Sequence, residues 1–331
     1  MEIVIFSILI ISIVFAYKKN SWLIWPIGVV LIYFVGFRNI SVGTDTANYA
    51  LYFQILKNGG IIDSEYLYGI LNKIVIYLNG EFFWVQILAS ILTIVPILWT
   101  VSSKSKFPYL SLFLYLTLYI YFYSFNIVRQ CIAISICFAA VSLFLDKKMK
   151  FFGLVLLAIN FHASAIIIVP LYFIRNIKLN SVKISILLIS TFFMGIFLPS
   201  YLVSLGATVG YAKYLTGNFE LGSLVGNMFF SLLLNGIFFI VYKFENQKND
   251  RLFYLFLLFL IVSNILIRFP FGNRIILYFG IFQILYFPNL LARLPRKERS
   301  IMFIFILLYA LLMFAIFYGN GEILPYKTVF E

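Results

Sequence analysis

The sequence predicts an all-α, polytopic transmembrane helical bundle, and two observations lead to this fold class. First, 63% of the 331 residues are hydrophobic and only 11% are charged, whereas soluble domains are roughly half apolar and a quarter charged. One water-soluble core of this length cannot hide so much apolar surface. Second, the apolar runs are long and do not alternate with polar residues, which excludes a membrane β-barrel. The membrane-spanning elements are therefore predicted to be helices.

Charged or Gly/Pro-rich breaks separate the apolar runs and predict the individual helices. The runs of spanning character lie at residues 3–17, 21–37, 82–101, 107–124, 127–145, 184–204, 226–242, 252–267, 274–291 and 300–318. The largest hydrophilic segments, near 38–81 and 205–225, are predicted to be loops outside the cytoplasm. Because no internal repeat or linker interrupts the chain, we expect a single integral membrane domain over residues 1–331.

The stretch 151–174 has two interpretations, one span or two short helices hinged at Asn160-Phe161-His162-Ala163. Lys18 and Lys19 follow the first run and indicate a cytoplasmic loop, which places the N-terminus outside. A single crossing at 151–174 would leave every later basic cluster outside, whereas two crossings return these clusters to the cytoplasm. We adopt the hinged alternative, which gives about 11–12 crossings. Its helices are too short to span alone and need burial among neighbours.

The formal net charge of +13 is explained by these cytoplasmic loops and does not indicate binding to nucleic acid. One histidine and two cysteines exclude a structural zinc site. The chain contains no nucleotide-binding glycine motif and no Asp-x-Asp pair of the kind that holds a metal in nucleotide-sugar enzymes. We therefore expect neither a metal nor a cofactor, and a substrate that requires no nucleotide.

Several arginines fall on the outer side under this topology, against the usual trend for positive charge. They are Arg38, Arg129, Arg268 and Arg274. An arginine in hydrocarbon costs about 2.5–3.5 kcal/mol, so such residues usually face a polar cavity. Their planar guanidinium groups hold two phosphate oxygens at once, which predicts a diphosphate-binding site. The alternative is that each arginine reaches a lipid headgroup or pairs with Asp45, Glu65 or Glu81.

Two residues are candidates for the proton acceptor of a catalytic site. His162 is the only histidine and lies at the predicted hinge; an imidazole accepts a proton near neutral pH. A hydrogen-bonded core position is the alternative for His162. Asp45 lies in Gly43-Thr44-Asp45-Thr46, which opens the first outer loop. That string is also typical of a turn in which the aspartate caps a helix from Ala47. The residues alone do not separate His162 from Asp45.

Candidate sugar-binding residues come from the same outer segments. They are Tyr49, Tyr52, Gln130, Tyr211 and Tyr214. The first two, with Phe53, form one aromatic face of a predicted helix, which suits stacking on sugar rings and equally suits packing against the protein.

Five short segments, in this order and spacing, resemble the EpsG family of Wzy-type polysaccharide polymerases. They are Phe37-Arg38, Val42–Thr46 with Tyr49, Val128-Arg129-Gln130, Phe161–Ala165 and Pro325-Tyr326-Lys327. The resemblance implies a metal-independent glycosyltransferase in the bacterial cytoplasmic membrane, with a GT-C-like helical architecture and a site on the outer face. Such enzymes join oligosaccharide repeat units carried on undecaprenyl diphosphate, which serve as both donor and acceptor, into O-antigen, capsule or exopolysaccharide. A chain-length-regulating co-polymerase is an implied partner, while the segment 205–225 is short for a polymerase outer loop.

The resemblance also implies roles for the outer residues. Arg129, Arg268 and Arg274 would hold the diphosphate, His162 or Asp45 would accept the proton, and Arg38 would orient Asp45 or contact phosphate. Three rival functions use the same features: a transporter or flippase of lipid-linked sugars, a ligase that moves finished polymer to another acceptor, and, more distantly, a membrane acyltransferase with a lone histidine.

Overall fold

The computed structural model describes residues 1–61, 65–174, 179–197, 221–245, 250–267, 269 and 272–331. These residues pack as two compact units. The first unit comprises Met1–Phe173 and Phe287–Glu331, and the second comprises Ile174–Tyr286. Both units are helical, and no β-strand occurs within the described ranges, so the predicted all-α fold class is confirmed. The sequence predicted one domain and shows no linker at the unit boundary.

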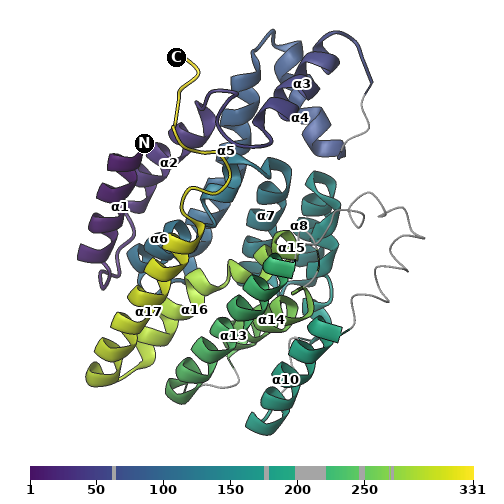
Figure 1. The fold of residues 1–331 in the computed structure, drawn as a ribbon. Helices are drawn as coiled ribbons and strands as arrows, with labels where there is room; N and C mark the ends of the chain where they lie inside the picture. Colours follow the sequence, from purple (N-terminus) through teal and green to yellow (C-terminus); the bar gives the residue numbers. More distant parts are fainter. Residues whose placement is uncertain (62–64, 175–178, 198–220, 246–249, 268, 270–271) are drawn as a thin grey trace. The chain divides into compact units, whose positions relative to one another are not determined.

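The first unit is built around a long central helix, α5, which packs against α2 and α7, while α7 packs against α8 (Figure 1). The bounds of its main helices are α1 (Glu2–Val14), α2 (Ile24–Gly36), α5 (Phe82–Lys104), α6 (Pro108–Thr117), α7 (Val128–Phe144), α8 (Lys148–Phe161) and α17 (Arg296–Phe317). The helix α16 (Gln283–Arg293) contributes its C-terminal part to this unit.

Length and composition identify four helical stretches that can cross a membrane: Phe82–Lys104, Gly226–Phe244, Gly272–Arg293 and Arg296–Phe317. Large apolar side chains also point outward, among them Ile3, Val29 and Leu308, each more than half exposed. Such surfaces are stable in a lipid bilayer, where hydrocarbon replaces water as the solvent. The chain is therefore a membrane protein.

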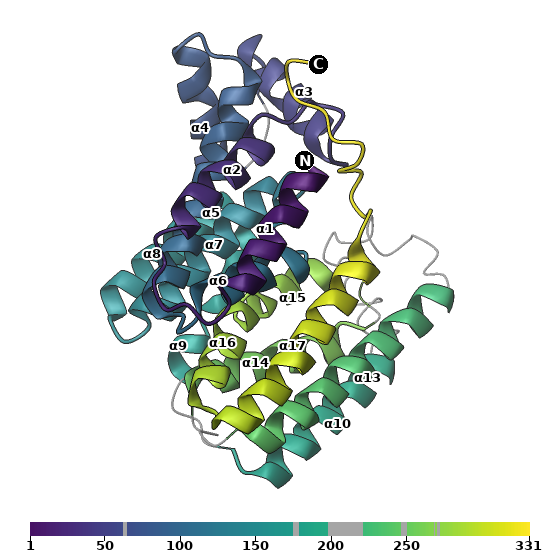
Figure 2. The ribbon, with the colours of Figure 1, turned by 90° about the vertical axis from the view of Figure 1, so that its left-hand side faces the viewer.

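The predicted outer loop 38–81 contains two further helices, α3 (Thr46–Lys57) and α4 (Tyr66–Tyr77). They lie at the same end of the first unit as both chain termini (Figures 1 and 2). The aromatic face of α3 is used for packing: Phe53 is fully buried beside Phe82. The rings of Tyr49 and Tyr52 lie 5.5 and 5.9 Å from that of Tyr68. The face therefore packs against the protein through Phe53, while Tyr49 and Tyr52 are half-buried and their sugar-binding role stays a prediction.

The chain reverses direction at His162. The helix α8 ends at Phe161, His162 has extended backbone angles, and a 3₁₀ helix, η2 (Ala163–Ile168), leads to the short α9 (Leu171–Ile174). The rings of Phe151 and Tyr172 stack with their centroids 5.7 Å apart. A straight helix would separate these two residues by about 30 Å. The hinged interpretation of 151–174 is therefore confirmed: the stretch is a helical hairpin and not one span.

The C-terminal tail returns along the first unit to the loop after α2 (Figure 2). The backbone N–H of Asn39 donates to the carbonyl of Lys327 at 3.0 Å, and that of Val329 donates to Phe37 at 2.8 Å. The hydroxyl of Tyr326 donates to the carbonyl of Phe34 at 3.0 Å. The two ends of the predicted family pattern are thus hydrogen-bonded to each other.

Among the residues that the structure describes, two predicted spans are interrupted. The run 107–124 forms a helix only to Thr117, because Tyr119 adopts a left-handed backbone with φ of 65° and its hydroxyl donates to the carbonyl of Asn320. A separate 3₁₀ turn, η1 (Phe122–Phe125), follows. The run 274–291 is divided into α15 (Gly272–Gly280) and α16. Most of the predicted loop 205–225 lies outside the described residues.

The second unit packs α14 (Arg251–Ile265) against α10 (Ser181–Phe197), α13 (Leu221–Phe244) and α15 (Figure 1). Asn264 of α14 is fully buried, and its side chain forms hydrogen bonds with residues of α10 and α13. Its Oδ1 accepts from Ser231 and from Asn235, and its Nδ2 donates to the Leu188 carbonyl and to Thr191. Since a buried amide without partners is costly, these bonds fix the register of the three helices.

Gly195 is the point where α10 comes closest to α14. A Cβ atom at this position would lie 1.8 Å from the carbonyl oxygen of Asn264. We therefore expect Gly195→Ala to push the helices apart and to lower the free energy of unfolding by about 1–3 kcal/mol. Thermal unfolding of the purified protein in detergent measures this loss. Gly236→Ala is the matched control, because a Cβ there meets no atom within 4 Å; equal unfolding temperatures for the two variants would contradict the prediction.

Candidate functional site

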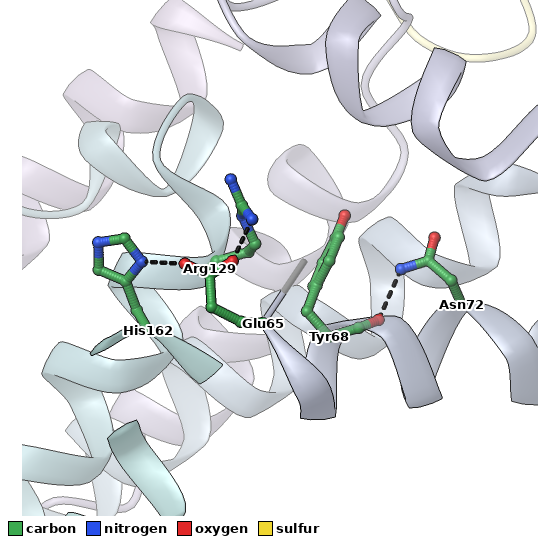
Figure 3. Close-up of polar contacts among 5 residues, drawn as sticks. All are labelled: Glu65, Tyr68, Asn72, Arg129 and His162. Atoms are coloured by element: carbon green, nitrogen blue, oxygen red, sulfur yellow. Dashed lines mark hydrogen bonds and ion pairs between the residues drawn. The ribbon is translucent and has the colours of Figure 1, made fainter. Parts of the chain in front are cut away.

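One carboxylate joins two of the predicted site residues. Glu65 lies directly before α4, Arg129 is in the first turn of α7, and His162 is the hinge residue after α8. Oε1 of Glu65 lies 2.7 Å from Nδ1 of His162, and Oε2 pairs with a terminal guanidinium nitrogen of Arg129 (Figure 3). The three residues are far apart in sequence, with Glu65 64 positions from Arg129 and 97 from His162.

The negative charge of Glu65 determines which ring nitrogen of His162 carries the proton. Burial alone would raise the pKa of Glu65, but the hydrogen bond from His162 and the positive charge of Arg129 outweigh it and hold that pKa below its ordinary value. An ionised carboxylate only accepts hydrogen bonds, so we assign the proton to Nδ1 of His162. In the neutral imidazole, Nε2 then keeps its lone pair and is the nitrogen that can accept a proton. This is the orientation that a general base requires.

Arg129 retains binding capacity beyond its ion pair. Its guanidinium carbon lies 5.6 Å from the ring centre of Tyr49 and 6.0 Å from that of Tyr68. Its Nε is buried and finds no hydrogen-bond acceptor among the residues that the structure describes. The side chain is 33% exposed. Because a guanidinium has five N–H donors, Arg129 can bind an anion while it stays paired with Glu65.

Arg38 has a different environment from the one predicted. It is 1% exposed, its Nε donates to the hydroxyl of Thr46 at 3.2 Å, and its terminal nitrogen donates to the carbonyl of Val35. The guanidinium also lies 5.8 Å from the ring centre of Phe125. Burial lowers its pKa to about 10, which still leaves it charged at neutral pH. Its Nε and one terminal nitrogen therefore face Thr46 and the backbone, and the predicted contacts of Arg38 with phosphate or Asp45 stay predictions.

The Gly43–Thr46 loop packs against the chain just before α7. The side-chain oxygen of Asn126 accepts from the backbone N–H of Thr44 at 2.7 Å. Gly43 has a φ of +93°, and a Cβ there would lie 2.7 Å from the same Asn126 oxygen. Only glycine fits this conformation and this close approach. Asp45 occupies the position before α3 without a side-chain capping bond, so its predicted catalytic role stays a prediction.

The remaining predicted site residues have separate outcomes. Gln130 is 3% exposed and lies in the helix packing, and its sugar-binding role stays a prediction. Arg274 is exposed on α15 of the second unit, and its diphosphate role stays a prediction. Arg268, Tyr211 and Tyr214 lie outside the described residues.

Glu65 is the site residue that the sequence analysis did not assign. It appeared there only as one of three carboxylates available to pair with an outer arginine. The sequence feature that could have identified Glu65 is the small number of acidic residues in the outer segments. A partly buried arginine and a lone histidine both require a partner, and few carboxylates are available to them. The sequence does not say which carboxylate reaches them, because that depends on how α4 packs against α8.

The segments that carried the family resemblance meet at one end of the first unit. Hydrogen bonds join the loop after α2 to the C-terminal tail and to Asn126, and Glu65 joins Arg129 to His162. A model of the EpsG family matches residues 21–328. The chain belongs to the EpsG family. This match includes every member of the Glu65–Arg129–His162 cluster. No curated protein and no solved structure matches this EpsG-family chain.

The ion pair of Glu65 predicts a pH-dependent contribution to stability. Because its pKa is lower in the folded chain, the stabilisation is present above the unfolded pKa of about 4.3 and is lost as the pH falls through the folded pKa. We expect Glu65→Gln to cost about 1–3 kcal/mol at pH 7. Thermal unfolding of both proteins across pH 3–7 tests this. The difference between their unfolding temperatures should narrow toward pH 3. A difference that stays constant from pH 7 to pH 3, or that is already absent at pH 7, would refute the assignment.

Proposed function

We propose that this protein is a polysaccharide polymerase of the outer face of the bacterial cytoplasmic membrane. It would join oligosaccharide repeat units carried on undecaprenyl diphosphate. The observation that carries the proposal is that Glu65 holds an anion-binding guanidinium and an oriented imidazole beside each other. Membership of the EpsG family supports the same reaction class.

Each member of the cluster has a role in glycosyl transfer. A hydroxyl oxygen of the acceptor unit forms a bond to the anomeric carbon of the donor chain, and the bond from that carbon to the diphosphate oxygen breaks. The hydroxyl proton passes to Nε2 of His162. The diphosphate leaves with the bonding electron pair, and Arg129 holds its developing charge. Glu65 donates no atom to the reaction; it keeps Nδ1 of His162 protonated and Arg129 in place.

The expected sizes of these effects are known from related chemistry. A positioned general base contributes about 10²–10⁴ in rate, and an arginine on a transferred phosphoryl group contributes about 10³–10⁵. A sugar whose anomeric carbon is bonded to a lipid diphosphate already carries a good leaving group, so the proposed reaction requires no nucleotide. Arg268 and Arg274 remain candidates for further diphosphate contacts.

The distribution of charge supports a site on the outer side. The cluster lies at the end of the first unit that carries both termini, α3 and α4 (Figure 1). Two helices of this unit, α1 and α8, have basic residues at the end that lies away from the cluster: Lys18 and Lys19 follow α1, and Lys147 and Lys148 begin α8. Cytoplasmic loops are enriched in such residues.

Deletion of the gene should collapse the surface glycan ladder to single repeat units on a gel of extracted polysaccharide. Complementation with the wild-type gene should restore the ladder. His162→Ala and Arg129→Ala should not restore it, since the expected rate losses exceed about a hundredfold. Lys57→Ala is the matched control, because this exposed residue at the end of α3 makes no contact in the cluster.

Other outcomes of the deletion identify the rival functions. Long chains that stay on the lipid carrier would indicate a ligase, and repeat units held on the cytoplasmic side would indicate a flippase. A normal ladder in the deletion strain, or full complementation by both alanine variants, would overturn the proposal.

The role of Glu65 gives a kinetic prediction. Glu65→Gln keeps the shape of the side chain but donates toward His162, which favours the wrong tautomer of the imidazole. We expect kcat of the reconstituted enzyme to fall by about 10²–10⁴, the full contribution of the base, while KM for the acceptor unit changes little. Glu65→Asp should recover part of kcat. A change confined to KM would show that Glu65 binds substrate and does not position His162.

A further inference from the structure

A long apolar groove lies on the first unit beside the cluster. It has a volume of about 810 Å³ and is lined by α2, α4, α5, α7 and α8. Its walls are almost entirely hydrocarbon and aromatic, with Trp25 and Trp99 among them, and Lys150 is the one charged residue among its lining residues.

One end of the groove adjoins the cluster. Leu67 and Phe161 line it there, and they are close neighbours in sequence of Glu65 and His162. The other end is marked by Lys150, in the first turn of α8. The groove therefore follows α8 over about 16 Å between Lys150 and Phe161, from the predicted cytoplasmic side to the proposed site.

We propose that this groove binds the isoprenoid chain of the lipid carrier while the diphosphate lies at Arg129. The inference rests on the proposed function for the identity of the carrier. Apart from Lys150 at one end and the indole N–H groups of Trp25 and Trp99, the lining side chains cannot form hydrogen bonds. A sugar or a peptide backbone would therefore lose most of its hydrogen bonds to water without replacement. A hydrocarbon chain loses none. Because the groove continues to the cluster, it suits a ligand in which a charged head is bonded to an apolar tail.

Gly153 provides a way to block the groove without disturbing the fold. It lines the groove on the outward face of α8, and a Cβ atom there meets no atom within 4 Å. Gly153→Leu would therefore place its side chain in the groove and would also raise the helix propensity of α8. Gly236→Leu is the matched control, because Gly236 is an exposed helical glycine of α13 with the same free space and lies outside the groove. Leu157→Trp narrows the groove at a second position.

The test uses the full chain in nanodiscs of phosphatidylglycerol and phosphatidylethanolamine. A polyprenyl phosphate with a photoreactive diazirine in its chain is cross-linked, and the labelled peptides are identified by mass spectrometry. We expect labels within 92–99 and 150–161, competed by unlabelled undecaprenyl phosphate but not by added phosphatidylglycerol. Gly153→Leu and Leu157→Trp should each reduce labelling by about tenfold, the usual effect of altering one hydrophobic contact in a pocket. Gly236→Leu should leave it unchanged.

Three results would overturn the inference: equal competition by phosphatidylglycerol, labels only on helices other than α2, α4, α5, α7 and α8, or undiminished labelling of both groove variants when these retain the wild-type unfolding temperature. Binding and polymerisation are separate readouts in this design. Specific labelling of the groove together with a normal glycan ladder in the deletion strain would leave the groove assignment intact and would overturn the proposed function instead.

Discussion

The two bonds of the Glu65 carboxylate are the interaction on which the site depends. Each oxygen is committed to a different partner, one to His162 and one to Arg129. A partly buried guanidinium and a half-buried imidazole are both expensive to leave without a partner, and a single carboxylate pairs with both. The same two bonds lower the pKa of Glu65, keep it ionised and thereby determine which ring nitrogen of His162 is free. The two bonds of Glu65 therefore both stabilise the packing of the cluster and determine the tautomer of His162 that the proposed chemistry requires.

The first unit contains several devices that keep this carboxylate in place. The hairpin at His162 brings the end of α8 to the start of α4, so that the imidazole reaches Glu65. The glycine turn at Gly43 anchors the start of α3 to Asn126, close to the first turn of α7. Arg38 fills the interior beneath that turn and bonds to Thr46. The guanidinium of Arg38 thus supports the site from inside the protein, which explains why an arginine at this position is compatible with burial.

Local sequence features predicted most helices and the hinge, because apolar runs and charged breaks report directly on what the bilayer tolerates. The reversal at His162 followed from the placement of basic loops, and the stacked rings of Phe151 and Tyr172 confirm it. Breaks inside apolar runs were not predictable in this way. The helix ending at Thr117 stops because Tyr119 binds the carbonyl of Asn320, a partner about two hundred residues away.

The amino-acid sequence by itself determined that this is an α-helical membrane protein of the EpsG family, and it predicted that four arginines and the lone histidine lie on the outer side. Hydrophobicity and charge act residue by residue, so these properties can be read without coordinates. Only the tertiary structure decided which residues meet: it paired Glu65 with His162 and Arg129, and it buried Arg38 and Gln130. Ion pairs and burial depend on a few ångströms of packing between helices distant in sequence, and that information does not lie in any local segment of the chain.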